Sequence, residues 1–305
     1  MSRSPRLLRL ALAVAIATVA AACAASDPGW PPQNTNFDLT PVPVSTEVTV
    51  GENRMLFNIL DRQNKSIAAA NTAVELRFYN LTASRTSAAV QGAATYMSTI
   101  EGRPGLYRLP VTFTQAGEWG VEAIATDLAG VKRTGRMVFP VRETGTTPPI
   151  GGQAPASDNP TTTEPTDLPN ISTDVDADPD FYRESVATAL AAQEPFAVVF
   201  ATPAFCTSAT CGPTLDVVKS AAAPFKGRMT FIHIEPYELE LVEGHLRPLL
   251  SDQNLPIPVA ATTQWGLPTE PYVFVVDSAG KVTAKFEGIA AADELAAAFA
   301  EVARS

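Results

Sequence analysis

The stretch Phe200-Ala-Thr-Pro-Ala-Phe-Cys206-Thr-Ser-Ala-Thr-Cys211-Gly-Pro213 joins a strand end, two cysteines and a helix start. The apolar residues 196–200 predict a buried strand, and Cys211-Gly-Pro213 opens a helical pattern. A thiol at a helix N-terminus has a lowered pKa, because backbone N–H groups and the helix dipole stabilise the thiolate. A second cysteine can resolve a mixed disulfide, so the stretch predicts a pair that cycles between dithiol and disulfide.

Length, composition and charge limit the possible functions. A chain of 305 residues with 46% apolar residues predicts about two domains with real cores. The net charge of −10 and the lack of any basic run in the sequence argue against nucleic acid as a partner.

The N-terminus has the pattern of an export signal. Three arginines precede the apolar residues 10–22, a run shorter than the roughly 20 residues that span a bilayer. Residues 1–22 are therefore predicted to be a signal peptide. The small residues before Cys23 resemble the lipobox of bacterial lipoproteins, although Ala20 stands where leucine is commonest. The resemblance implies lipidation of Cys23 and an extracytoplasmic protein anchored to the bacterial cell membrane; an ordinary signal peptide cleaved nearby is the alternative.

The number of cysteines fits this interpretation. The chain has three cysteines, and an odd cysteine in an exported protein needs a reason. If Cys23 carries lipid, Cys206 and Cys211 remain as a pair suited to an oxidising compartment.

Residues 23–37 are expected to form a tether, and residues 38–143 read as a β domain. Its expected strands are residues 46–50, 55–60, 73–79, 107–113, 119–125 and 136–141. Short strands at this spacing predict an all-β antiparallel sandwich. Gly105-Leu-Tyr107 followed by Gly117-Glu-Trp119 resembles a hairpin of immunoglobulin-like modules in bacterial exported proteins. The segment has no His or Cys, so we expect a spacer or docking module without a metal site.

The second half of the chain begins with a linker. Residues 144–173 are rich in Pro and Thr and are expected to stay extended. Residues 174–305 then alternate between helices and strands. A first helix is expected to begin after the capping residues 178–180 and to end at residue 192, and further helices over residues 212–225, 239–250 and 290–304. Strands are expected over residues 196–200, 229–234, 272–277 and 282–287. This order predicts a mixed sheet covered on both faces.

A second motif strengthens one interpretation of this half. Trp265-Gly266 followed by Glu270-Pro271 and an apolar strand resembles the aromatic-Gly and cis-proline segment of membrane-tethered, cytochrome-maturation-type thioredoxins. The resemblance implies an α/β thioredoxin-like C-terminal domain over residues 174–305, with Pro271 in the cis form. It also implies that Cys206 is the nucleophile and Cys211 the resolving cysteine, with Phe205, Glu270 and Pro271 at the substrate.

The pattern departs from that family. Four residues separate the cysteines, where thioredoxins have two. In a rival register Cys211-Gly-Pro213 takes the place of the family's Cys-Gly-Pro, and Thr214 then replaces the resolving cysteine. The family's buried acid before the nucleophile is missing from residues 196–205, and Glu235 or Glu270 is left as a substitute.

The resulting expectation is a membrane-anchored thiol–disulfide oxidoreductase without a cofactor. Its partners are the thiols and disulfides of exported or membrane proteins, and it contacts the membrane through the lipid on Cys23. Two other classes stay open: a non-catalytic binding module with a structural disulfide, and a copper-handling chaperone of respiratory assembly. Copper would need His233 beside the thiolates, because His245 lies among charged residues. Pro203, Thr207 and Cys211 come near the peroxiredoxin pattern of Pro, three residues, Thr or Ser, two residues and Cys, but Cys211 lies one position too far along.

Overall fold

The structure is a computed structural model that describes Trp30 and residues 38–98, 100 and 102–303. The expected signal peptide (1–22), Cys23 and most of the expected tether lie outside the described residues. Within the described part of the chain, no helix is both long and apolar enough to cross a membrane.

One sheet of seven antiparallel strands forms the N-terminal unit, in the order β1-β2-β5-β4-β3-β6-β7. The strands are β1 (Leu39–Pro43), β2 (Gly51–Asp61), β3 (Ala73–Asn80), β4 (Val90–Met97), β5 (Leu106–Phe113), β6 (Gly117–Thr126) and β7 (Lys132–Val141). The outermost strands approach each other, since the Asp38 N–H donates to the Thr134 carbonyl at 3.1 Å. The sheet is therefore nearly closed around its core.

Aromatic side chains fill that core. Phe113 contacts Trp119 with ring centroids 4.9 Å apart and Phe78 with centroids 5.7 Å apart. Trp30, within the expected tether, is also buried: its Nε1 donates to the Arg85 carbonyl and its ring packs against Tyr79. The chain is thus attached to the N-terminal unit seven residues after Cys23.

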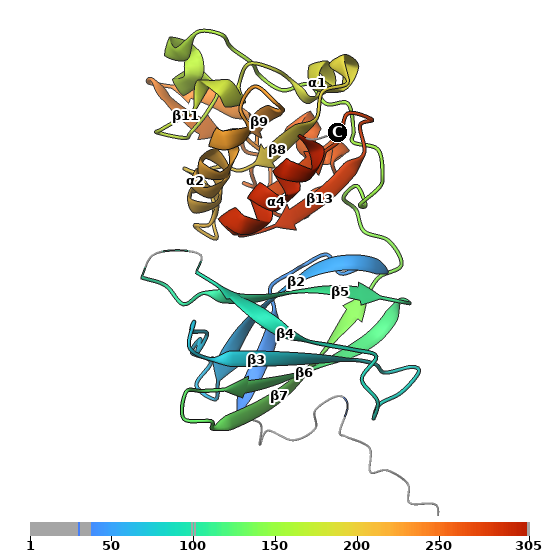
Figure 1. Cartoon of the computed structure of the whole chain (residues 1–305). Coiled ribbons are helices and arrows are strands. Elements are labelled where there is room, and N and C mark those ends of the chain that lie inside the picture. Colours follow the sequence, from blue (N-terminus) through green and yellow to red (C-terminus); the bar gives the residue numbers. More distant parts are fainter. Residues whose placement is uncertain (1–29, 31–37, 99, 101, 304–305) are drawn as a thin grey trace, which may run out of the picture.

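The C-terminal unit has a four-stranded sheet in the order β13-β12-β8-β9 (Figure 1). Its strands are β8 (Phe196–Phe200), β9 (Thr230–Ile234), β12 (Tyr272–Val276) and β13 (Val282–Glu287). Its helices are α1 (Val186–Ala192), α2 (Cys211–Ala222), α3 (Ala260–Gln264) and α4 (Ala292–Val302), with 3-10 turns η1 (Pro165–Asn170), η2 (Pro179–Phe181) and η3 (Ala223–Phe225). Strands β8 and β9 are parallel, and β12 is antiparallel to β8. Separate apolar clusters cover the two faces.

The predicted fold class is wrong. The described part of the chain is mostly β, with 38% of its residues in strands and 18% in helices, and it is dominated by the nearly closed antiparallel sheet. The structure does not show the α/β thioredoxin-like C-terminal domain expected for residues 174–305. Nor does the N-terminal unit divide into the two sheets of an immunoglobulin-like sandwich, because its seven strands form one continuous order. The domain boundaries stay a prediction.

One expected helix is in fact a β-hairpin. Residues 239–250 contain β10 (Leu239–Val242) and β11 (His245–Pro248), which pair antiparallel. Glu243 and Gly244 form the two-residue turn between them, both with positive φ (52° and 79°). Such turns match the twist of paired strands. The alternation Glu238-Leu-Glu-Leu has the period of a strand, and this local pattern prevails over helix propensity.

Residues 144–173 are not a loose extended segment. Ser157 and Leu168 are buried, the Ser157 Oγ accepts from Trp265 Nε1 at 3.1 Å, and Gln153 bridges to Lys281. The segment crosses the C-terminal unit because its few apolar residues and hydroxyl groups find partners there, although it could not form a core alone.

The two units contact each other directly. Arg54 of β2 donates to both carboxylate oxygens of Glu294 on α4 at 2.7 Å, and Lys285 of β13 donates to Glu47. An apolar cluster of Leu56, Met97, Leu106 and Ile289 lies in the same interface. Figure 1 shows the seven-stranded sheet directly below α4 and β13.

Candidate functional site

Three chain segments meet at one end of the four-stranded sheet. The register pairs Phe200 at the end of β8 with Ile234 at the end of β9 and with Tyr272 at the start of β12. The cysteine loop after β8, the segment after β9 and Pro271 before β12 therefore emerge side by side. Topology brings Cys206 and Glu270 to one sheet end although they are far apart in the sequence.

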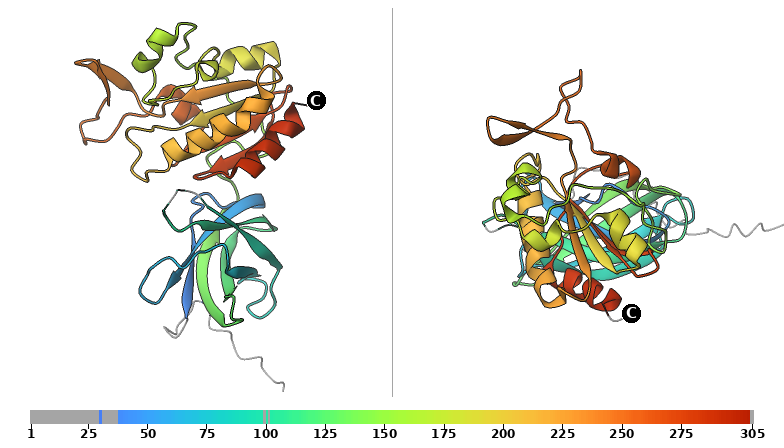
Figure 2. Two further views of the ribbon diagram at one scale, coloured as in Figure 1. Left: turned by 60° about the vertical axis from the view of Figure 1, so that its left-hand side comes forward. Right: turned by 90° about the horizontal axis from the view of Figure 1, so that it is seen from above.

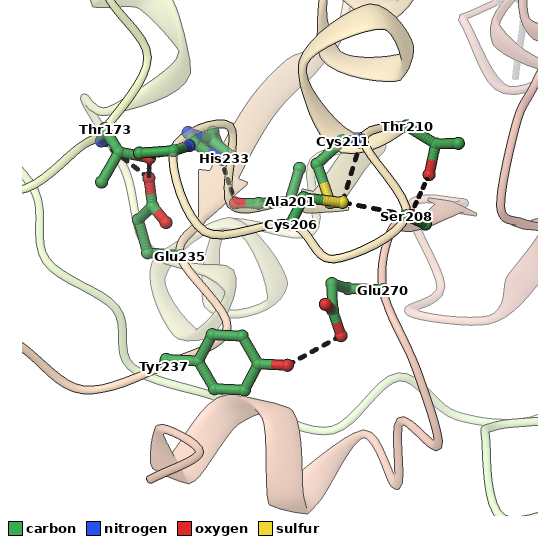
Figure 3. Close-up of a disulfide and its surroundings, with 11 residues drawn as sticks. Thr173, Ala201, Cys206, Ser208, Thr210, Cys211, His233, Glu235, Tyr237 and Glu270 are labelled. Atoms are coloured by element: carbon green, nitrogen blue, oxygen red, sulfur yellow. Dashed lines mark hydrogen bonds between the residues drawn. A yellow bond between two sulfur atoms is a disulfide. The ribbon is translucent and has the colours of Figure 1, made fainter. Parts of the chain in front are cut away.

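The two cysteines lie at disulfide distance in this loop. Their Cα atoms are 6.0 Å apart, within the roughly 7 Å that a disulfide allows. Cys211 is the first residue of α2, and its backbone N–H donates to Cys206 Sγ at 3.3 Å (Figure 3). The N–H donor and the positive end of α2 both favour negative charge on the Cys206 sulfur.

The two sulfurs differ in environment. Cys211 is fully buried among core residues, whereas Cys206 is only partly buried and Ser208 Oγ lies 3.2 Å from its sulfur. Ser208 Oγ is in turn 2.7 Å from Thr210 Oγ1. A partner can approach Cys206 more readily than Cys211. The two sulfurs are therefore not equivalent: the Cys206 sulfur is the more accessible one.

Glu270 and Pro271 lie at the same sheet end as the cysteine loop. The Glu270–Pro271 peptide bond is cis, as expected, and Pro271 is buried. Tyr237, just after β9, donates its hydroxyl proton to Glu270 Oε2 at 2.8 Å. Burial, followed by this hydrogen bond, raises the pKa of Tyr237. Phe205, the third expected substrate-side residue, is partly buried beside Cys206 in the loop.

A buried carboxylate ties the end of β9 to the cysteine loop. Glu235 is 8% exposed, and its Oε1 accepts from both the N–H and the hydroxyl of Thr173 at 2.7 Å. The Thr173 hydroxyl also accepts from the Ala204 N–H at 3.2 Å. Glu235 Oε2 has no hydrogen-bond partner, and the same holds for the buried hydroxyls of Thr202 and Thr214.

His233 does not lie open to a ligand. It is 2% exposed, its Nε2 is 2.9 Å from the Ala201 carbonyl, and its Nδ1 is 2.7 Å from the Tyr182 hydroxyl. Both ring nitrogens are engaged within the protein. His245 is exposed on β11. Among the described residues, no three His, Cys, Asp or Glu side chains are arranged to hold a metal ion.

No protein family model matches this chain, and no curated protein is similar to it in sequence. The site therefore has to be interpreted from its own geometry.

Sequence reasoning missed three residues at this site. Ser208 contacts Cys206, Thr173 contacts Glu235, and Tyr237 contacts Glu270. Ser208 could have been found from its position two residues after Cys206. Thr173 and Tyr237 carry no motif, and only the sheet topology brings them to the site.

Proposed function

We propose that this protein is an extracytoplasmic thiol–disulfide oxidoreductase, anchored to the bacterial cell membrane by a lipid on Cys23. It acts on the disulfides and thiols of exported or membrane proteins. The observation that carries the proposal is the contact between Cys206 Sγ and the Cys211 N–H at the start of α2. It supports a stabilised thiolate on the more accessible of two paired cysteines.

The reaction needs no group beyond the two cysteines and the partner. In the reducing direction the Cys206 thiolate attacks one sulfur of the partner disulfide, and the other partner sulfur leaves as a thiolate. The Cys211 thiolate then attacks Cys206 Sγ, which releases the second partner thiolate. The partner gains two electrons and the pair ends as the Cys206–Cys211 disulfide; the oxidising direction is the reverse.

The reduction potential of the pair tests this proposal. The full chain is equilibrated in glutathione and dithiothreitol buffers, then alkylated, and the modified cysteines are assigned by peptide mass. A value of about −120 to −270 mV supports an exchange enzyme. A value below about −300 mV marks a structural bridge, and the protein is then a binding module whose disulfide braces the loop.

A copper-handling function finds less support in the site. It would require His233 beside the cysteine sulfurs, and both nitrogens of this buried ring already have partners. Retention of copper by the reduced protein, abolished in His233→Ala, is the result that would favour it.

A further inference from the structure

We infer that residues 239–257, here called the ribbon, dock the cysteine-bearing segment of the polypeptide partner, an extended segment that is apolar and positively charged. This inference rests on the proposed thiol–disulfide exchange and specifies the class of substrate. Residues 239–257 contain the β10–β11 hairpin and the turn that follows it.

The hairpin has one wholly apolar face. Residues that pair directly across an antiparallel ladder lie on the same face. The register places together Leu239 with Pro248 and Leu241 with Leu246. The opposite face pairs Glu240 with Arg247 and Val242 with His245. Leu241 is 54% exposed, so the apolar face is open to solvent at this residue, while Leu239, Leu246 and Pro248 are partly buried.

Exposed apolar side chains are concentrated on this ribbon. Among the described residues, nine large hydrophobic side chains are exposed, and four of them are Leu241, Leu250, Leu255 and Ile257, at 37% to 59%. The other five are scattered over the rest of the chain. Single exposed apolar residues need no explanation, but a group of them marks an interaction site.

The ribbon adjoins the cysteine site. It follows β9, whose end is paired with the end of β8 directly before the cysteine loop. Tyr237 stands at the base of the ribbon and hydrogen-bonds Glu270, and Figure 3 shows both side chains on one side of Cys206. The ribbon projects from the body of the C-terminal unit (Figure 2). A segment lying along it would continue toward the Cys206 sulfur.

The ribbon also offers backbone groups to an extended chain. Strands β10 and β11 form a sheet of only two strands within the described residues. Open edges of this kind accept an added strand through main-chain hydrogen bonds, while side-chain contacts give the selectivity. An extended segment fits such an edge better than a folded surface does.

The charge of the ribbon determines which sign of charge the partner segment should carry. Within the ribbon Glu240, Glu243 and Asp252 are exposed, against the single cation Arg247, and Glu238 directly before the ribbon is exposed as well. This excess of negative charge favours a cationic segment. A second copy of the chain is a poor occupant because its own net charge is −10, so two copies repel each other on average.

The test uses two synthetic disulfide peptides with identical apolar residues around the disulfide, one flanked by lysines and the other by glutamates. The reduced full chain is mixed with each peptide and with the small neutral disulfide 2,2′-dithiodipyridine. At low ionic strength we expect the lysine peptide to react about fivefold faster than the glutamate peptide, with the difference shrinking in salt. The double variant Leu241→Ser/Leu255→Ser should react about fivefold more slowly with the lysine peptide than the wild type does. Its rate with 2,2′-dithiodipyridine should stay within about twofold of the wild-type rate.

The matched control is Leu128→Ser, which removes an 81% exposed leucine from the turn between β6 and β7. It should leave all rates unchanged. Equal rates for both peptides, or an unaffected double Leu variant, would overturn the inference while leaving the exchange activity standing. A wild-type chain that reduces neither peptide would instead refute the proposed function.

A binding measurement separates docking from chemistry. The lysine peptide, with its thiols alkylated, is titrated into Cys206→Ser/Cys211→Ser and followed by fluorescence anisotropy. We expect binding that Leu241→Ser/Leu255→Ser weakens about fivefold. If sedimentation shows a dimer that the same substitutions dissociate, the ribbon serves self-association and the inference is wrong.

Discussion

Lys285 Nζ of the C-terminal sheet lies 2.8 Å from Glu47 Oε1 of the N-terminal unit, and the Glu47 side chain is 3% exposed. Burial alone raises the pKa of Glu47, but hydrogen bonds from Lys285 and Thr147 outweigh it and lower the pKa from 4.5 to about 2. Thr146 also donates to this carboxylate. Glu47 thus joins β13 and the segment after β7 to one buried anion.

Glu47→Gln should destabilise the protein by roughly 1–3 kcal/mol, because Lys285 then lacks its buried countercharge. Urea unfolding at pH 7 measures the free energy of unfolding of the wild type and the variant. Glu75→Gln is the control, since Glu75 pairs with Arg77 at the surface, where the side chains are 41% and 36% exposed. Such a pair contributes roughly 0–1 kcal/mol. Equal effects of the two substitutions would contradict the role assigned to Glu47.

The contribution of Glu47 should depend on pH. Its pKa is lowered from 4.5 to about 2 on folding, so its stabilisation is fully present above pH 4.5 and is lost as the pH falls toward 2. The shift corresponds to roughly 3 kcal/mol at most. The stability difference between wild type and Glu47→Gln, measured by urea unfolding at pH 7, 4 and 3, should shrink with falling pH. A constant difference would contradict the low pKa.

Much of the local structure could be predicted from the sequence. The strands at residues 196–200 and 272–276 and the helix beginning at Cys211 occur where the apolar runs and Cys211-Gly-Pro213 predict them. The cis bond before Pro271, which only the family resemblance implied, also occurs. In these segments local propensity and burial favour the same structure.

The predictions that went wrong depended on long-range arrangement. Strand β4 was not predicted, because Val90-Gln-Gly-Ala-Ala-Thr-Tyr-Met97 is short of large apolar residues, and residues 46–50 are not a strand. The order in which seven strands join one nearly closed sheet has no local signal. The thioredoxin-like fold class was inferred from two motifs. Two motifs describe the cysteine loop and the Pro271 turn but not the layers around them.

His233→Ala should destabilise the protein by roughly 2–4 kcal/mol. The substitution leaves a cavity and removes one hydrogen-bond partner each from the buried Tyr182 hydroxyl, which keeps Ser172, and from the Ala201 carbonyl. Thermal or urea unfolding measures the loss. His245→Ala is the matched control, because the chain has two histidines and His245 is exposed; it should change stability by less than about 0.5 kcal/mol. Similar values for both would show that His233 is not a core residue in solution.

Tyr237→Phe should cost about 1 kcal/mol of stability, because it removes the hydrogen bond to Glu270 Oε2 and keeps the ring. If Glu270 is a substrate-side residue, the same variant should also slow exchange with a peptide disulfide more than exchange with a small one. Tyr96→Phe is the control, since Tyr96 lies in the N-terminal unit on β4. If Tyr237→Phe exchanges with the peptide disulfide at the wild-type rate, Glu270 is not a substrate-side residue.

The roles of the two cysteines predict opposite single-variant behaviour. In Cys211→Ser, Cys206 keeps its accessible sulfur and the helix N-terminus beside it, but nothing resolves the mixed disulfide. This variant should therefore accumulate a covalent complex with a peptide disulfide, visible on a non-reducing gel and released by dithiothreitol.

Cys206→Ser should accumulate little covalent complex with the peptide, because Cys211 is fully buried. In the reduced wild type, Cys206 should also alkylate faster than Cys211, because the Cys206 sulfur is only partly buried. Trapping by Cys206→Ser instead of Cys211→Ser would reverse the assignment. It would favour the register in which Cys211-Gly-Pro213 presents the nucleophile and Thr214 stands in the resolving position.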